Sequence, residues 1–149
     1  MKRIEQIHTD KKRFLELLLL ADEQESMIDL YLEKGEMFVL FEDEAVAAEC
    51  VVTDNGGGIF ELKNIAVLPK KQGKGYAKAL VEFLFQHYRG KFSEMHVGTG
   101  DCPPILHFYE KLGFHVSYRV KNFFTDNYDH PIFDCGKQLV DMVYLVRKA

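Results

Sequence analysis

This 149-residue sequence lacks tryptophan and has only three cysteines. Cys50, Cys102 and Cys135 are odd in number, scattered and without CxxC spacing, which argues against both a disulfide framework and a zinc site. No histidine pair has metal-ligand spacing either. We therefore expect three reduced thiols and no bound metal.

Long apolar runs and broadly basic stretches are also missing. The longest apolar run, Leu17 to Ala21, is far shorter than the roughly 20 residues that cross a bilayer. The charged N-terminal segment shows no cleavable signal pattern, so we expect a cytoplasmic protein without a membrane partner. A formal net charge of -4 and a pI near 5.9 argue against nucleic acid as a partner.

The composition that remains is that of an ordinary globular protein. Hydrophobic residues make up 47% and charged residues 28% of the chain, which excludes disorder as its main state. A chain of this length buries roughly two-thirds of its unfolded surface. We expect one domain over residues 1–149.

The segment from Glu61 to Tyr88 predicts a strand, a sharp loop and a helix. Ile65, Ala66 and Val67 end the strand before a proline, and the apolar spacing after the loop is that of a helix buried on one face. Glycines in the loop allow positive φ and a close approach of backbone to ligand. Because N–H groups at a helix N-terminus favour anions, the loop predicts a phosphate site.

Charge along this segment supports the same interpretation. Leu62 to Val81 contains five lysines and no acid in a chain of net negative charge. Lysines at a helix N-terminus oppose the helix dipole unless an anion is present. The alternative is a solvated loop with a lysine-rich helix start.

Two motifs within these elements resemble the GNAT superfamily of N-acetyltransferases. The loop residues match its Q/R-x-x-G-x-G/A signature, and the segment ILHFYEKLGF (Ile105 to Phe114) is similar to a second family segment. The resemblance implies that the loop binds the pyrophosphate of acetyl-CoA, while Ile65, Ala66 and Val67 pair with its pantetheine arm. The implied loop residues are Gln72, Gly73, Lys74, Gly75, Tyr76 and Ala77. The family commonly has an asparagine where this chain has Cys102, which leaves one CoA contact open.

The resemblance also implies a mixed α/β fold. We expect a twisted, mostly antiparallel sheet with a central splayed pair of parallel strands and helices on both faces. The expected strands are 37–41, 45–53, 59–67, 92–99, 114–120 and 138–147. The expected helices begin near residues 10, 23 or 26, 77 and 103, and the second of them is expected to end at Gly35.

Two residues carry the predicted chemistry. By resemblance, Tyr109 is the general acid beside the thioester sulfur, although its apolar neighbours also suit a core position. Glu61 is the candidate base, although it could instead be a surface carboxylate without a catalytic role. The other candidate bases are the histidines 96, 107, 115 and 130. Direct attack by an amine needs no enzyme nucleophile, and none is indicated.

The acceptor is the least determined part of the prediction. We expect a primary amine of a small molecule, with a protein or peptide amine and a non-catalytic acyl-CoA-binding module as alternatives. For the aromatic insertion Lys121 to Gly136 we expect one of three roles: it packs under the fold, it lines the acceptor site, or it forms a homodimer contact. If the insertion lines the acceptor site, Phe124 and Tyr128 are the candidate apolar walls of that site. Asp126 and Asp129 are the candidate acids that attract a cationic amine.

Overall fold

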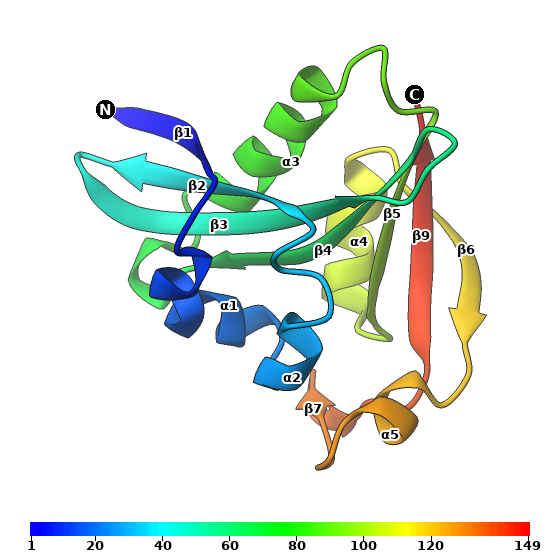
Figure 1. Ribbon diagram of the computed structural model, residues 1–149. Coiled ribbons are helices and arrows are strands. Elements are labelled where there is room, and N and C mark those ends of the chain that lie inside the picture. The colour runs from blue at the N-terminus through cyan, green and yellow to red at the C-terminus, as the bar shows by residue number, and fades with distance from the viewer.

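A computed structural model describes residues 1–149 as one large sheet flanked by helices (Figure 1). The strands are β1 (Lys2–Ile7), β2 (Glu36–Glu42), β3 (Ala45–Asp54), β4 (Ile59–Val67), β5 (Glu94–Gly100), β6 (His115–Val120) and β9 (Met142–Lys148), with β7 (Phe133–Asp134) and β8 (Lys137–Gln138) in a separate hairpin. The helices are α1 (Leu15–Ala21), α2 (Glu25–Ile28), α3 (Tyr76–His87), α4 (Pro103–Lys111) and α5 (Phe123–Asn127), with 3-10 turns at Lys11–Phe14 and Pro69–Lys71. None of the helices is long and apolar enough to cross a membrane.

The strand order is β1-β2-β3-β4-β5-β9-β6, and β4–β5 is the single parallel pair. Its pairing runs only from Ile59 opposite Glu94 to Leu62 opposite Val97, although β4 continues to Val67. Beyond Leu62 the two strands therefore diverge, which leaves the β5-facing edge of β4 without a strand partner (Figure 1). The predicted mixed α/β fold with a splayed parallel pair is confirmed.

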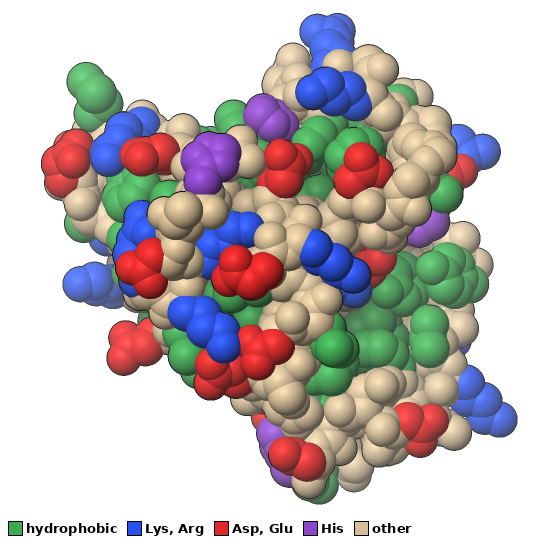
Figure 2. Space-filling view, in the orientation of Figure 1, with side chains coloured by type: hydrophobic (Ala, Val, Ile, Leu, Met, Phe, Trp, Pro, Cys, Tyr) green, Lys and Arg blue, Asp and Glu red, His purple; other side chains and the backbone are tan.

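Helices cover both faces of the sheet because its central strands are apolar on both sides. In β3, Cys50 packs in a core that includes Leu80 and Leu84 of α3, whereas its neighbour Val51 packs in a second core with Leu18 of α1. Figure 2 shows lysines and acids intermixed over the side that carries α1 and α2, and more apolar surface toward β9 and β6.

Several expected elements differ from the structure. Strand β1 was not predicted, because its sequence KRIEQI is half charged and only Ile7 is buried on this sheet edge. The second helix is a short turn, α2, rather than a helix that continues to Gly35. The closing strand begins at Met142 rather than 138, since Lys137–Gln138 forms β8 and Leu139 packs in a small core with Phe124 and Ile132.

The prediction of three reduced thiols is wrong for two of them. Cys102 and Cys135 form a disulfide with a Cα–Cα distance of 5.9 Å, whereas Cys50 is free and buried. Cys135 lies at the turn of the β7–β8 hairpin, and Cys102 is the N-cap of α4. The sequence separation of 33 residues gave no indication that the insertion folds back onto α4.

Glu49 on β3 is a fully buried acid whose two carboxyl oxygens have no hydrogen-bond partner in the protein. Burial raises the pKa of Glu49 well above its ordinary 4.5. The folded protein therefore keeps a proton that the unfolded chain releases once the pH exceeds about 4.5. This makes the fold less stable as the pH rises from there toward the folded-state pKa.

We predict that Glu49→Gln abolishes this pH dependence. Relative to the variant, the wild type should lose up to about 1.4 kcal/mol of unfolding free energy per pH unit over this window. Urea unfolding at about pH 5, 6.5 and 8 measures the difference, with the exposed Glu82→Gln as the control. Parallel stability curves for the wild type and Glu49→Gln would show that Glu49 is ionised in the fold.

Candidate active site

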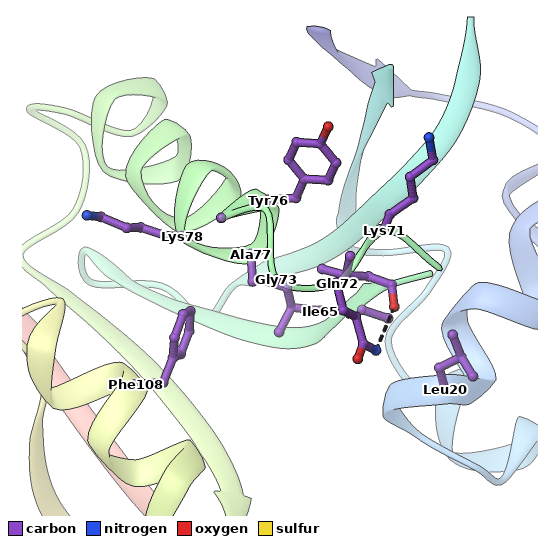
Figure 3. Close-up of a pocket in the computed structure, with 12 residues that line it drawn as sticks. Leu20, Ile65, Lys71, Gln72, Gly73, Tyr76, Ala77, Lys78 and Phe108 are labelled. Carbon is purple, nitrogen blue, oxygen red and sulfur yellow. Dashed lines mark hydrogen bonds between the residues drawn. The ribbon is translucent and has the colours of Figure 1, made fainter. Parts of the chain in front are cut away.

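The glycine loop, residues 68–75, lies between the end of β4 and the start of α3. Gly73 and Gly75 have φ angles of 80° and 81°, in the left-handed region that glycine adopts without strain, and nothing lies within 4 Å of the position a Cβ would take at either. A cavity of about 440 Å³ opens beside the loop, which we call the loop cavity. Leu20 of α1 and Phe108 of α4 border it from opposite sides (Figure 3).

The loop cavity is rich in free hydrogen-bond donors. The backbone N–H groups of residues 73–78 make no backbone hydrogen bond, and no side chain caps α3. These groups lie at the positive end of a 12-residue helix. The arrangement fits a phosphate anion, which accepts several such bonds at once.

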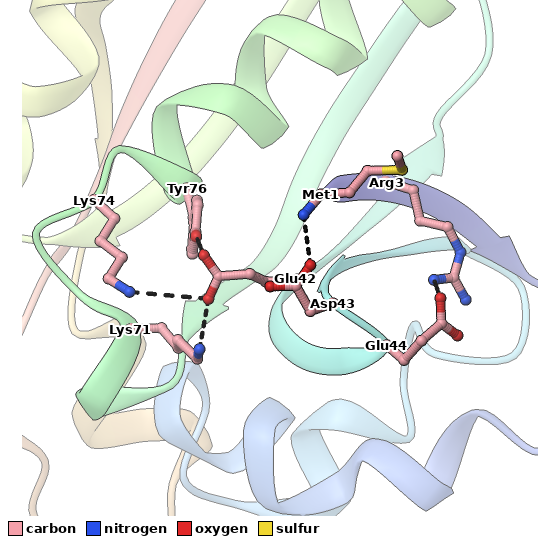
Figure 4. Close-up of polar contacts among 8 residues, drawn as sticks. All are labelled: Met1, Arg3, Glu42, Asp43, Glu44, Lys71, Lys74 and Tyr76. Atoms are coloured by element: carbon pink, nitrogen blue, oxygen red, sulfur yellow. Dashed lines mark hydrogen bonds and ion pairs between the residues drawn. The ribbon is translucent and has the colours of Figure 1, made fainter.

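Glu42, at the end of β2, is a part of this site that the sequence did not predict. Its carboxylate pairs with Lys71 at 2.5 Å and Lys74 at 3.8 Å, and also accepts a hydrogen bond from Tyr76 (Figure 4). The hydrogen bonds from Lys71 and Tyr76 lower the pKa of Glu42 to about 2. Two of the five lysines are thus engaged by an acid distant in sequence, and Lys78 is the cavity-lining lysine without an ion pair.

Tyr109 lies at the base of the gap between β4 and β5. With Ile65, Ala77 and Phe108, it lines the central cavity, a space of about 440 Å³ that shares several residues with the loop cavity. Only 4% of Tyr109 is exposed, and burial raises its pKa. Its ring packs edge-on against Phe108 and Phe114, so the residue is at once part of the core and part of the cavity wall.

Glu61 faces a third space of about 320 Å³, which we call the tyrosine cavity because Tyr31, Tyr128 and Tyr144 line it. The Glu61 carboxylate accepts hydrogen bonds from Tyr144 at 2.7 Å, Asn55 at 3.0 Å and Lys63 at 3.1 Å. Burial acts to raise the pKa of Glu61, but these bonds and the Lys63 charge outweigh it, so the pKa is lowered. Lys63 and Gly98 also line the central cavity, so the spaces that hold Glu61 and Tyr109 adjoin.

The insertion contributes to both packing and the cavity wall. Phe124 packs with Ile132 and Leu139 in a small core, whereas Phe123 and Tyr128 line the tyrosine cavity together with Asn127. The acids that the sequence indicated do not line this cavity: Asp126 is exposed, and Asp129 pairs with His130. None of the four histidines considered as bases lines these cavities.

The cluster with the most metal-ligand character consists of Cys102, Asp134 and Cys135. Their ligand atoms lie within 4.8 Å of one another. The disulfide, however, engages both sulfur atoms, and metal binding to cysteine requires thiolates. In this state the cluster does not fit a metal ion.

Comparison with known proteins places this fold and site in a family. Residues 33–116 match the model described as the acetyltransferase (GNAT) domain. Over 145 residues the chain is 33% identical to the uncharacterized N-acetyltransferase YvbK of Bacillus subtilis strain 168, covering 96% of this chain and 94% of that protein. The chain therefore belongs to the GNAT family of N-acetyltransferases, whose members use acetyl-CoA as donor, as its motifs indicated.

Two solved structures share the whole architecture. A GNAT family acetyltransferase from Elizabethkingia anophelis with acetyl-CoA bound has a TM-score of 0.94 at 31% identity and covers 99% of this chain and 98% of its own. A Bacillus subtilis acetyltransferase in complex with CoA has a TM-score of 0.90 at 32% identity, with coverage of 100% and 99%. The agreement extends over the insertion and the N-terminal strand, which the family model does not span.

Proposed function

We propose that this protein transfers the acetyl group of acetyl-CoA to a primary amine of a small molecule, by direct attack of the amine in a ternary complex. The observation that carries the proposal is the row of adjoining cavities. It leads from free N–H groups at the start of α3, past Tyr109, to Glu61 in the tyrosine cavity. The tyrosine cavity, of about 320 Å³, has the volume of a small-molecule site.

The donor end is assigned to the glycine loop and the end of β4. Gln72, Gly73, Lys74, Gly75, Tyr76 and Ala77 surround the pyrophosphate in this proposal, with Ile65, Ala66 and Val67 along the pantetheine arm. The unpaired edge of β4 beyond Leu62 offers backbone groups for strand-like pairing. Gln72 itself donates to the carbonyl of Val67 at 3.2 Å, which holds the loop against the strand end. Acetyl-CoA in turn supplies an activated thioester carbonyl.

Tyr109 and Glu61 handle the protons of the transfer. The raised pKa of Tyr109 keeps its phenol protonated, so it can donate to the departing sulfur. The lowered pKa of Glu61 keeps its carboxylate ionised at neutral pH, so it can accept the amine proton, directly or through one water. The new bond joins the amine nitrogen to the acetyl carbon as the carbon–sulfur bond breaks.

Release of free CoA thiol in the presence of individual amines tests the function. We expect release that depends on a small amine, with a product heavier by one acetyl group. Acetyl-CoA binding without release for any amine would indicate a binding module. Release with peptides alone would indicate a protein or peptide acetyltransferase.

We predict that Glu61→Gln lowers kcat/KM for the amine by about 100-fold, because the amide cannot accept the proton. The substitution keeps the side-chain size and an oxygen for the Tyr144 bond. Initial rates across amine concentrations, with acetyl-CoA saturating, measure the loss. An unchanged kcat/KM would assign proton removal to solvent and leave Glu61 a structural role.

A further inference from the structure

The tyrosine cavity contains a second carboxylate, Asp22, which the proton-transfer chemistry does not use. Asp22 follows the last residue of α1 and is half-buried. Its Oδ1 accepts a hydrogen bond from the Tyr128 hydroxyl at 2.7 Å, and its Oδ2 accepts one from the Tyr31 hydroxyl at 2.9 Å. Two neutral phenols thus fix both oxygens in place.

Asp22 has no cationic partner, in contrast to Glu61 in the same cavity. Lys63 pairs with Glu61, whereas no lysine, arginine or histidine lies within ion-pair distance of Asp22. Lys34 also lines the cavity, but it is exposed and makes no ion pair. Because both donors to Asp22 are neutral phenols, no protein cation balances the carboxylate, and the site favours a cationic ligand.

The walls around Asp22 suit the same ligand. Tyr31, Tyr128 and Phe123 present aromatic rings to the cavity, and ammonium groups bind to such ring faces as well as to carboxylates. The Lys63 ammonium already lies 5.6 Å from the centre of the Tyr31 ring. The surroundings of Asp22 thus combine anionic and aromatic contacts.

Three further contacts hold the insertion against the end of α1. Gln24 accepts a hydrogen bond from the Asp129 N–H at 2.9 Å and donates to the Asn127 carbonyl at 3.5 Å, while His130 lies 2.9 Å from Glu23. These contacts flank the bond between Tyr128 and Asp22. The fold therefore builds the surroundings of Asp22 from segments about a hundred residues apart, as the Tyr128–Asp22 separation of 106 shows.

We propose that Asp22, with Tyr31 and Tyr128, binds a second cationic group of the acceptor, so that the preferred substrates are diamines or related dications. This rests on the proposed function: one amine is acetylated near Glu61 while the other remains protonated beside Asp22. A monoamine fills the reactive position but leaves Asp22 without a counter-ion.

The test compares diaminobutane with butylamine, which differ only in the second amine. The wild type should show a higher kcat/KM for diaminobutane, and Asp22→Asn should lower the diamine-to-monoamine ratio by about 10- to 100-fold, as expected for the loss of a charged hydrogen bond. Asp126→Asn, which removes an exposed charge from the insertion that packs beside Asp22, should leave the ratio unchanged. A ratio that Asp22→Asn does not change would overturn the proposal.

A binding measurement separates this proposal from the proposed function. Calorimetric titration of diaminobutane into the CoA-saturated protein should show binding that weakens by a similar factor in Asp22→Asn. If no amine is acetylated but this difference is present, the transferase proposal fails and the cation site stands. If amines are acetylated without the difference, the cation site fails alone. Tyr128→Phe removes one phenol donor to Asp22 and keeps the ring, so it should weaken diaminobutane binding by a smaller factor. This second variant tests the cation site even if Asp22→Asn does not fold.

Discussion

Tyr109→Phe is expected to lower kcat by about 100- to 10,000-fold, with little change in the Michaelis constant for acetyl-CoA. Among the residues of α4 that line the central cavity, only Tyr109 has a side-chain proton donor. Its neighbour Phe108 also borders the loop cavity, so the Tyr109 phenol lies close to the proposed donor site. The substitution removes the hydroxyl and retains the ring contacts with Phe108 and Phe114. Because the effect falls on the transition state rather than on binding, kcat should carry it.

Tyr88→Phe is the matched control for this experiment. Tyr88 is also buried, and its hydroxyl donates to Glu36 at 2.6 Å, away from the three cavities. Its loss should lower the melting temperature and leave kcat near that of the wild type. Steady-state kinetics and thermal unfolding of both variants distinguish the two roles. A Tyr109→Phe enzyme with normal kcat would place Tyr109 in the core alone.

Gly75→Val is expected to weaken CoA binding by about 100-fold or more while the protein remains folded. Gly75 is the N-cap of α3 and has a φ of 81°, which a β-branched residue adopts only with strain. Either the loop changes conformation or the new side chain occupies the space beside the free N–H groups. In the proposed donor site, both outcomes would remove charge-assisted hydrogen bonds from the loop to phosphate, and one such bond contributes about 1.5–3 kcal/mol.

Gly90→Val separates this effect from backbone strain. Gly90 follows α3 at its other end, with a φ of 82° and, as at Gly75, no atom within 4 Å of the position that a Cβ would take. The two variants should lose similar stability, but Gly90→Val should bind CoA normally. Calorimetry with CoA and thermal unfolding provide both measurements. Equal CoA affinities in the two variants would show that the glycine loop is not the donor site.

Local sequence patterns were sufficient for the strand, glycine loop and helix from Ile59 to His87, whereas the fold class came from the family resemblance of two motifs. A strand that ends before a proline, glycines that tolerate positive φ, and a one-sided apolar helix are properties of neighbouring residues, so they can be recognised without knowing the fold. The positions of β4 and α3 follow closely, at Ile59–Val67 and Tyr76–His87. The strand β1 shows the limit of such patterns, since an edge strand with charged residues carries little apolar signal.

Tertiary structure decided which distant groups meet. The Glu42 carboxylate engages two loop lysines, the disulfide joins Cys102 to the insertion, and Tyr128 reaches Asp22 across 106 positions. The sequence suggested Asp126 and Asp129 as acids of the acceptor side, but the fold places Asp22 in the cavity instead. Local propensity and spacing contain no information on such pairs, because each forms only when segments far apart in the chain pack together: β2 against the glycine loop, and the insertion against α4 and the end of α1.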